Sequence, residues 1–305
     1  MAEPVGSALT HTALFYRGEA EFTAEITAFV QAGLARGEPA MILLPGGKTR
    51  TVSARLDVMP GELVFADATE LSRNPARMIP EVRAFIDKHP GQRVRYVAEP
   101  LWPGRSAAEM CEVARNEALV NLAFAQAKAT ILCPYDAAGL PGPVLAAARR
   151  THQEPAASGA SAQTWRDNLP PECDRPLGPP PPGAEVLGYG TDLAPVRRLV
   201  ERHARLAGLS AEHAMDLVLA ANEVAANTIS HTVGGGVIHV WQTPTEILCQ
   251  VHDQGCITDP MAGRVRFGPD GRGHGLWLVN QVCDLVELRS GPAGTTVRMH
   301  MRRDA

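Results

Sequence analysis

The chain has 305 residues, of which 45% are hydrophobic and 20% are charged, a balance that is typical of soluble globular proteins. The formal net charge is −4 and no run of Lys or Arg stands out, which argues against a nucleic-acid-binding protein. No stretch has the length and apolarity of a membrane span, and the first residues lack the pattern of a secretory signal. We therefore expect a cytoplasmic protein of two domains, each with its own core.

The cysteines are scattered and include no Cys-x-x-Cys pair. Several of them lie in apolar segments, so we expect buried free thiols in a reducing compartment. The six positions are Cys111, Cys133, Cys173, Cys249, Cys256 and Cys283.

Strand and helix patterns alternate through the first half of the chain. Short apolar runs predict strands at residues 12–16, 40–44, 63–65, 94–97 and 129–133. Helical spacing predicts helices at residues 20–35, 75–88, 107–125 and 143–150. This alternation predicts a layered α/β domain with a mainly parallel sheet over residues 1–153.

One segment of this half resembles a phosphate-binding loop. Pro45-Gly-Gly-Lys48-Thr49 follows a predicted strand, but the pattern Gly-x-x-x-x-Gly-Lys-Thr requires glycine at position 42, where Ile42 stands. We therefore assign no phosphate loop there.

Polar residues of this half collect at the predicted strand ends and just after them, where open α/β sheets bind ligands. They predict a sensory pocket formed by His11, Tyr16, Glu99, Trp102, Arg105, Glu117, Tyr135 and Asp136. A structural alternative stays open, in which Trp102 and Tyr135 are packing residues and Glu99 or Asp136 caps a helix. His11 and Cys133 are possible metal ligands, but they lack ligand-pair spacing and predict no metal site.

Five segments of this half together resemble the MEDS sensory domain. They are His11-Thr-Ala-Leu-Phe-Tyr16, Asn74-Pro-Ala-Arg77, Glu99-Pro-Leu-Trp-Pro-Gly-Arg105, Asn116-Glu-Ala-Leu-Val-Asn-Leu-Ala-Phe124 and Cys133-Pro-Tyr-Asp136. The resemblance covers roughly residues 11–152. It implies that the domain senses an unidentified small molecule and carries out no catalysis.

Residues 154–183 predict a linker because they are rich in Pro, Ala, Ser and Gly and can bury little apolar surface. Trp165 is the exception, and we expect it to dock on one of the domains. A strand at residues 184–189 then opens the second domain, 184–305, and Thr191 or Asp192 caps a helix that runs to residue 203.

The second domain contains four polar or glycine-rich elements in order. A helix at residues 217–231 places Glu223, Asn227 and His231 on one face. The strand 246–253 ends its apolar row in Asp253, and Gly255 follows. Glycines 271, 273 and 275 open an apolar helix, where free backbone N–H groups attract anions, and Gly294-Thr295 lies between two strands.

These four elements resemble the ATP-binding domain of the GHKL superfamily, and most closely the anti-sigma-factor serine kinases. The resemblance implies an α/β sandwich that uses ATP and Mg²⁺ as cofactors, with Asn227 on Mg²⁺, Asp253 on the adenine amine and Glu223 as the catalytic residue. Further cofactor-binding residues implied are Gly255, Gly273, Gly275 and Thr295. Residues 256–272 would form a lid, whose Arg264, Arg266 or Arg272 could reach a γ-phosphate, and of these we choose Arg272.

Two departures from the GHKL pattern affect the expected activity. Cys256 and Ile257 follow Gly255 where another glycine is usual, and His274 stands between the glycines of the second box. A looser turn after Gly255 would weaken nucleotide binding or slow turnover, so catalysis is less firmly predicted than ATP binding.

Three functions remain open from the sequence. The leading one is a cytoplasmic switch protein that holds a sigma factor, phosphorylates Ser or Thr of an antagonist protein, or does both, with the first domain as its sensor and a homodimer as a possible form. The second is a binding-only anti-sigma module. The third, a histidine kinase, requires a helical hairpin with an accepting His before the ATP domain, where this chain is rich in proline.

Overall fold

The computed structural model describes residues 9–56, 63–152, 165–266 and 274–303. The chain divides into two compact units, Met1–Cys173 and Asp174–Ala305, each described here by itself. No helix among the described residues is long and apolar enough to cross a membrane.

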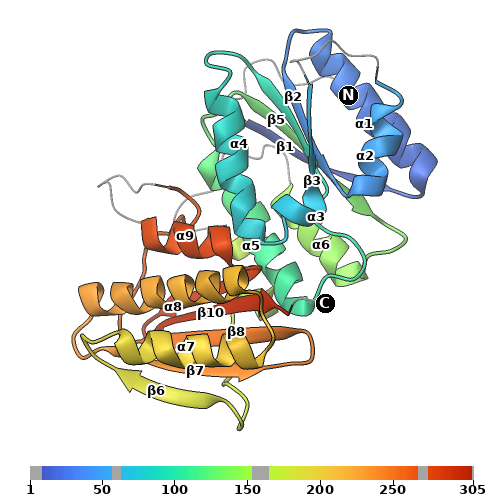
Figure 1. Ribbon diagram of the computed structural model, residues 1–305. Helices are drawn as coiled ribbons and strands as arrows, with labels where there is room; N and C mark the ends of the chain where they lie inside the picture. Colours follow the sequence, from blue (N-terminus) through green and yellow to red (C-terminus); the bar gives the residue numbers. More distant parts are fainter. Residues whose placement is uncertain (1–8, 57–62, 153–164, 267–273, 304–305) are drawn as a thin grey trace. The chain divides into compact units, whose positions relative to one another are not determined.

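Unit 1 is built on a five-stranded sheet in the order β1-β5-β4-β2-β3, in which every pairing is parallel (Figure 1). The strands are β1 (Leu9–Tyr16), β2 (Ala40–Leu44), β3 (Leu63–Asp67), β4 (Val94–Ala98) and β5 (Ala129–Asp136). Residues of β2 and β4 are buried throughout, as strands covered on both faces must be. The predicted parallel α/β domain is confirmed.

Helices cover both faces of this sheet. The α-helices are α1 (Glu19–Leu34), α2 (Gly46–Ser53), α3 (Ala68–Leu71), α4 (Met78–Asp87), α5 (Ala107–Ala123) and α6 (Gly142–Thr151). Apolar residues of α1 and α2 share a core with Tyr16, Ile42 and Val97 on one face of the sheet. Because strand side chains alternate between faces, His11, Cys133 and Tyr135 point to the opposite face, where their partners are on α5 and at the end of α6.

The predicted linker is partly folded. Two short 3-10 helices, Trp165–Asn168 and Pro171–Cys173, belong to unit 1, and the Trp165 side chain is buried with the Arg115 guanidinium 5.1 Å from its ring centre. Cys173 forms a disulfide with Cys111 of α5. The expectation of free thiols is therefore wrong for this pair, whereas Cys133, Cys249 and Cys283 are buried and free and Cys256 is exposed and free.

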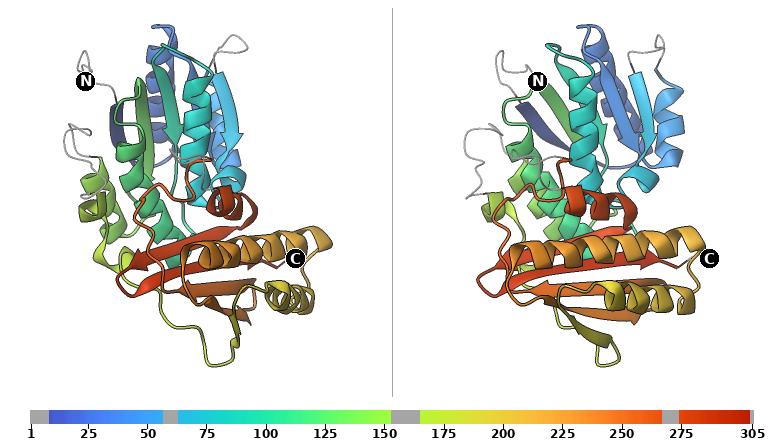
Figure 2. Two further views of the ribbon diagram at one scale, coloured as in Figure 1. Left: turned by 90° about the vertical axis from the view of Figure 1, so that its left-hand side faces the viewer. Right: turned by 60° about the vertical axis from the view of Figure 1, so that its left-hand side comes forward.

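Unit 2 has a five-stranded antiparallel sheet in the order β6-β7-β8-β10-β9. The strands are β6 (Glu185–Tyr189), β7 (Gly236–Gln242), β8 (Glu246–Asp253), β9 (Leu285–Gly291) and β10 (Gly294–Arg302). Helices α7 (Ala194–Leu206), α8 (Ala211–His231) and α9 (His274–Val282) share one apolar core with the sheet. Figure 2 shows the helices and strands of this unit from two further sides. The predicted two-layer α/β arrangement of this unit is confirmed.

Candidate functional site

Helix α8 carries the first two candidate residues of unit 2. Ser210 caps the helix by accepting a hydrogen bond from the His213 N–H at 3.2 Å, and the helix buries an apolar row that runs from Leu217 to Ala225. Glu223 and Asn227, four residues apart, share a half-buried face beside that row.

The start of α9 lies against these two side chains. A Cβ atom on Gly275 would stand 3.1 Å from Glu223 Oε2 and 3.1 Å from Asn227 Nδ2. Only glycine allows a carboxylate and an amide to pack this closely against the start of a helix, the end that attracts phosphate oxygens. The structure brings together Glu223, Asn227 and Gly275, which are far apart in the sequence.

Asp253 ends β8 with both carboxylate oxygens already engaged. Its Oδ2 accepts a hydrogen bond from Thr228 Oγ1 at 2.7 Å, and its Oδ1 accepts one from the Gly255 N–H at 2.8 Å. Thr228 in turn accepts a hydrogen bond from the Tyr189 hydroxyl at 3.0 Å. Sequence reasoning missed Thr228, although its place directly after Asn227 on the same helix could have suggested it.

Strand β10 is the neighbour of β8 in the sheet and carries the next candidate residues. Thr295 lies opposite Asp253 in the antiparallel register, and its hydroxyl donates to the Gly255 carbonyl at 2.9 Å. Gly294 has φ +108°, and a Cβ there would stand 2.1 Å from the Asp253 carbonyl oxygen. No side chain can be placed at 294 without moving the backbone that carries Asp253.

The segment after Gly255, where the sequence departs from the GHKL pattern, is attached to β9. The Ile257 N–H donates to Ser290 Oγ at 2.7 Å, and Ser290 Oγ lies 2.8 Å from Thr295 Oγ1. Farther along, Asn280 Nδ2 of α9 donates to the Gly263 carbonyl at 3.0 Å. Hydrogen bonds thus hold this segment at both ends of its described part.

The candidate arginines occupy different positions. Arg264 is buried, and the Arg266 guanidinium lies 5.4 Å from the ring centre of Trp277. Arg272 and Gly273 lie outside the described residues, and their assignment stays a prediction, as do the roles of the other candidate residues.

The predicted sensory residues of unit 1 lie in separate groups. On the α1 and α2 face, the Tyr16 hydroxyl donates to Glu99 Oε1 at 2.6 Å, and Lys48 Nζ lies 2.5 Å from the same oxygen. Burial raises the pKa of Glu99 and outweighs the opposing effects of Lys48 and Tyr16. Lys48, the lysine of the rejected phosphate loop, is thus paired with a buried carboxyl group.

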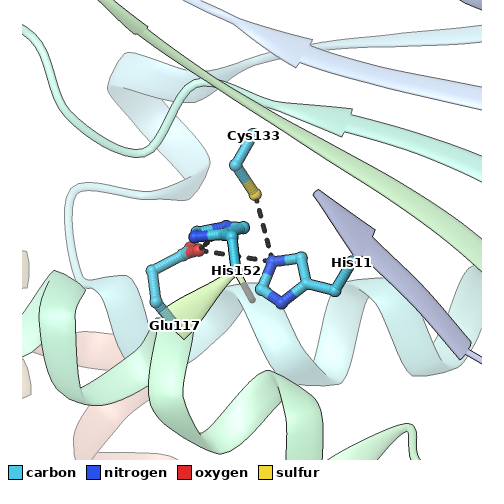
Figure 3. A group of neighbouring side chains, drawn as sticks. All are labelled: His11, Glu117, Cys133 and His152. Atoms are coloured by element: carbon cyan, nitrogen blue, oxygen red, sulfur yellow. Dashed lines mark hydrogen bonds and ion pairs between the residues drawn. The ribbon is translucent and has the colours of Figure 1, made fainter. Parts of the chain in front are cut away.

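The second group lies on the opposite face and is drawn in Figure 3. His11 Nε2 is 3.3 Å from Cys133 Sγ and 3.4 Å from Glu117 Oε2, while His152 Nε2 is 3.0 Å from Glu117 Oε2. The Tyr135 hydroxyl donates to Glu117 at 3.3 Å. Burial opposes ionisation of Glu117, but the close contacts with His11 and His152 outweigh it and lower its pKa.

The remaining predicted sensory residues make structural contacts. The Arg105 guanidinium lies 3.8 Å from the ring centre of Trp102 and donates to the Ser72 carbonyl at 2.7 Å. Asp136 Oδ1 accepts hydrogen bonds from the backbone N–H groups of residues 138 and 139 and so closes the turn after β5. Asp136 therefore closes a turn and does not cap a helix, whereas Trp102 packs against Arg105 as the structural alternative expects.

A cavity of about 150 Å³ lies beside the second group. Its wall is mainly apolar and comes from α5, α6 and the segment around Cys173, with the Cys111–Cys173 disulfide as part of it. Glu117 and Tyr135 also line this cavity. The cavity could enclose a small, mainly apolar molecule next to a few polar groups.

Comparison with known families agrees with this architecture. A model of the MEDS domain (methanogen/methylotroph, DcmR sensory domain) matches residues 10–153, and a model of the histidine kinase-like ATPase domain matches residues 190–301. A search of curated proteins found no match.

The fold and the family comparison together define a regulatory protein with a kinase-like ATPase domain. Within that class, this chain combines an N-terminal MEDS sensory domain with a C-terminal ATPase domain of the GHKL type. A domain of the GHKL type implies ATP binding, usually with Mg²⁺. The described residues fit such a ligand, because Glu223 and Asn227 meet beside Gly275 at the start of α9, and because Asp253 is held in one orientation.

Proposed function

We infer that this protein is an ATP- and Mg²⁺-dependent protein kinase that phosphorylates Ser or Thr of an antagonist protein, and that it takes part in partner switching around a sigma factor. The observation that carries this function is the convergence of Glu223 and Asn227 on Gly275, at the end of the helix where phosphates would bind. The MEDS unit would sense a small molecule and bias this activity.

Each described residue of the site has a role suited to its chemistry. Asn227 would offer its amide oxygen to Mg²⁺, a hard cation that prefers oxygen ligands. Asp253 would accept a hydrogen bond from the exocyclic amine of adenine. Bound ATP supplies the phosphoryl group, and Glu223 would orient the acceptor hydroxyl and receive its proton.

A histidine kinase is less well supported. Residues 165–193, all of which the structure describes, contain two 3-10 helices and β6 but no helical hairpin. His203, the nearest histidine on α7, is paired with Glu185 at 2.8 Å within unit 2 itself. That histidine is therefore engaged in joining α7 to β6.

Phosphate transfer tests the function directly. The full-length protein is incubated with radiolabelled ATP, Mg²⁺ and a candidate antagonist protein. Glu223→Gln should keep ATP binding and lower transfer about 10²–10⁴ fold, because the general base is removed. Glu212→Gln, on an exposed position of the same helix, is the matched control and should transfer normally.

The outcomes separate the alternatives. Label that is stable to acid and lost with Glu223→Gln supports a Ser/Thr kinase, whereas acid-labile label indicates transfer to His. ATP binding by calorimetry without any transfer, together with capture of a sigma factor, would replace the kinase by a binding-only module. Wild-type ATP affinity in both Asn227→Ala and Asp253→Asn would overturn the site.

A further inference from the structure

Four buried side chains with metal-binding atoms meet in unit 1, away from the ATP site. They come from four different elements: His11 from β1, Glu117 from α5, Cys133 from β5, and His152 from the residue that ends α6. One ligand atom from each lies within 4.8 Å of the others, and none of the four residues is more than 8% exposed. The sequence could not reveal this group, since only folding brings these positions together.

The hydrogen bonds around the two histidines direct both Nε2 atoms into the group. His11 Nδ1 lies 3.0 Å from Asn121 Oδ1, and His152 Nδ1 lies 2.7 Å from the Ala148 carbonyl oxygen. Asn121 is itself oriented, because its Nδ2 donates to the Thr151 carbonyl at 2.8 Å. Both Nδ1 atoms face acceptors and therefore carry the proton, which leaves a lone pair on each Nε2, as in metal-binding histidines.

The thiol and hydroxyl protons do not satisfy every atom that faces into this group. The Cys133 thiol can donate to His11 Nε2, and the Tyr135 hydroxyl donates to Glu117. His152 Nε2 remains 3.0 Å from Glu117 Oε2, yet it makes no hydrogen bond with any described residue, because the geometry is unsuitable. Two buried acceptor atoms at this distance oppose each other unless an added proton or a metal ion lies with them.

We propose that His11, Glu117, Cys133 and His152 bind a divalent transition-metal ion, with zinc as the best match. Zn²⁺ prefers four nitrogen, sulfur and oxygen ligands in a tetrahedron, whose ligand atoms stand about 3.3–3.6 Å apart. The 3.3 and 3.4 Å contacts of His11 Nε2 fit this spacing, and the 3.0 Å contact of His152 is slightly shorter.

The charges also balance in this site. One thiolate and one carboxylate carry two negative charges, and the two imidazoles are neutral, so a divalent ion leaves no net charge in the buried group. Glu117 and Tyr135 also line the adjacent cavity. A ligand in that cavity would lie next to the metal.

Metal content and cobalt spectroscopy of the full-length protein test this proposal. After removal of metal with a chelator, the protein is dialysed against ZnCl₂ and then freed of excess ion. We expect about one equivalent of zinc per chain. With Co²⁺ in place of zinc, we expect intense tetrahedral d–d bands and a thiolate-to-cobalt charge-transfer band.

Variants assign the ligands. Cys133→Ser should abolish the charge-transfer band, and His152→Ala should weaken metal binding by at least ~100-fold. Asn121→Ala removes only the partner of His11 Nδ1 and should weaken binding about 10–100-fold. Cys249→Ser and Cys283→Ser, which change buried free cysteines of unit 2, are the matched controls and should bind Co²⁺ like the wild type.

Two results would overturn the proposal. The first is a wild-type protein that binds no zinc or cobalt after dialysis, and this needs no variant to fold. The second is a charge-transfer band that survives in Cys133→Ser, with circular dichroism confirming a folded chain, since the thiolate would then belong to another cysteine. ATP binding takes no part in either measurement, so the outcome is independent of the kinase assignment.

Discussion

Breaking the Cys111–Cys173 disulfide should lower the stability of unit 1 more than most single substitutions do. The two cysteines are 62 residues apart in the sequence, and the bond therefore closes a large loop in the unfolded chain. Loop-closure entropy for that length corresponds to about 4 kcal/mol of unfolding free energy at 25 °C. The loss should appear on reduction with dithiothreitol and in a Cys111→Ser/Cys173→Ser variant.

Urea unfolding measures this effect. For a slope of about 2 kcal/mol per molar urea, a loss of about 4 kcal/mol lowers the midpoint of unit 1 by roughly 2 M. Trp165 is buried within the region that the disulfide holds, so tryptophan fluorescence reports this transition together with circular dichroism. The transition of unit 2 is the internal control, because both of its buried cysteines, Cys249 and Cys283, are free.

A unit 1 midpoint that stays unchanged on reduction, with the disulfide shown by mass spectrometry beforehand, would contradict this stabilisation. An equal fall of the unit 2 midpoint would also contradict it, since the two units would then unfold as one.

Three further predictions follow from unit 2. Gly275→Ala places a methyl group 3.1 Å from the candidate site side chains, so calorimetry should show weaker ATP binding, whereas Gly291→Ala, which meets nothing within 4 Å, should not. Gly294→Ala should lower the thermal midpoint, because φ +108° and the 2.1 Å approach to the Asp253 carbonyl oxygen together cost about 2 kcal/mol or more. Burial lowers the pKa of His300, but the hydrogen bonds that its ring donates to two carboxylates outweigh it and raise the pKa to about 9. Stability from this group, roughly 3 kcal/mol, is therefore complete below pH 6.5 and disappears as the pH rises through 9. In urea unfolding between pH 6 and 10, the unfolding free energy of the wild type should approach that of His300→Gln as the pH rises. A difference in unfolding free energy that stays constant over this range would contradict the raised pKa of His300.

Local patterns were enough to predict the layered architecture. Each strand of unit 1 has an apolar run that identifies it, and the alternation with helices required parallel pairing, which the sheet order confirms. The helix that carries Glu223 and Asn227 was predicted from spacing alone, although α8 begins six residues earlier than predicted, at Ala211 after its Ser210 cap. Helix α2 was not predicted, because it begins with two glycines and buries only Val52, so it has no apolar row. Strand β7 was not predicted either, although an apolar run follows its first residue, Gly236.

Contacts between distant positions could not be predicted. Nothing near Cys111 in the sequence indicates Cys173, and no ligand-pair spacing joins His11 to His152, which lie near the two ends of the matched MEDS residues 10–153. Likewise, the residues predicted to line one sensory pocket alternate between the two faces of the sheet, and their strand positions alone did not decide which would meet. Tyr16 and His11 are on the same strand and contact different groups.

The fixed orientation of the Asp253 carboxylate affects the entropy of binding a hydrogen-bond donor. Thr228 and Gly255 each occupy one of its oxygens, so folding has already removed the rotational freedom of this side chain. An incoming donor meets a fixed acceptor with lone pairs to spare, and it avoids the ordering entropy of about 0.5–1.5 kcal/mol that a mobile side chain would add to binding. Thr228→Val would return that freedom, and the loss in affinity should then appear mainly as a less favourable binding entropy.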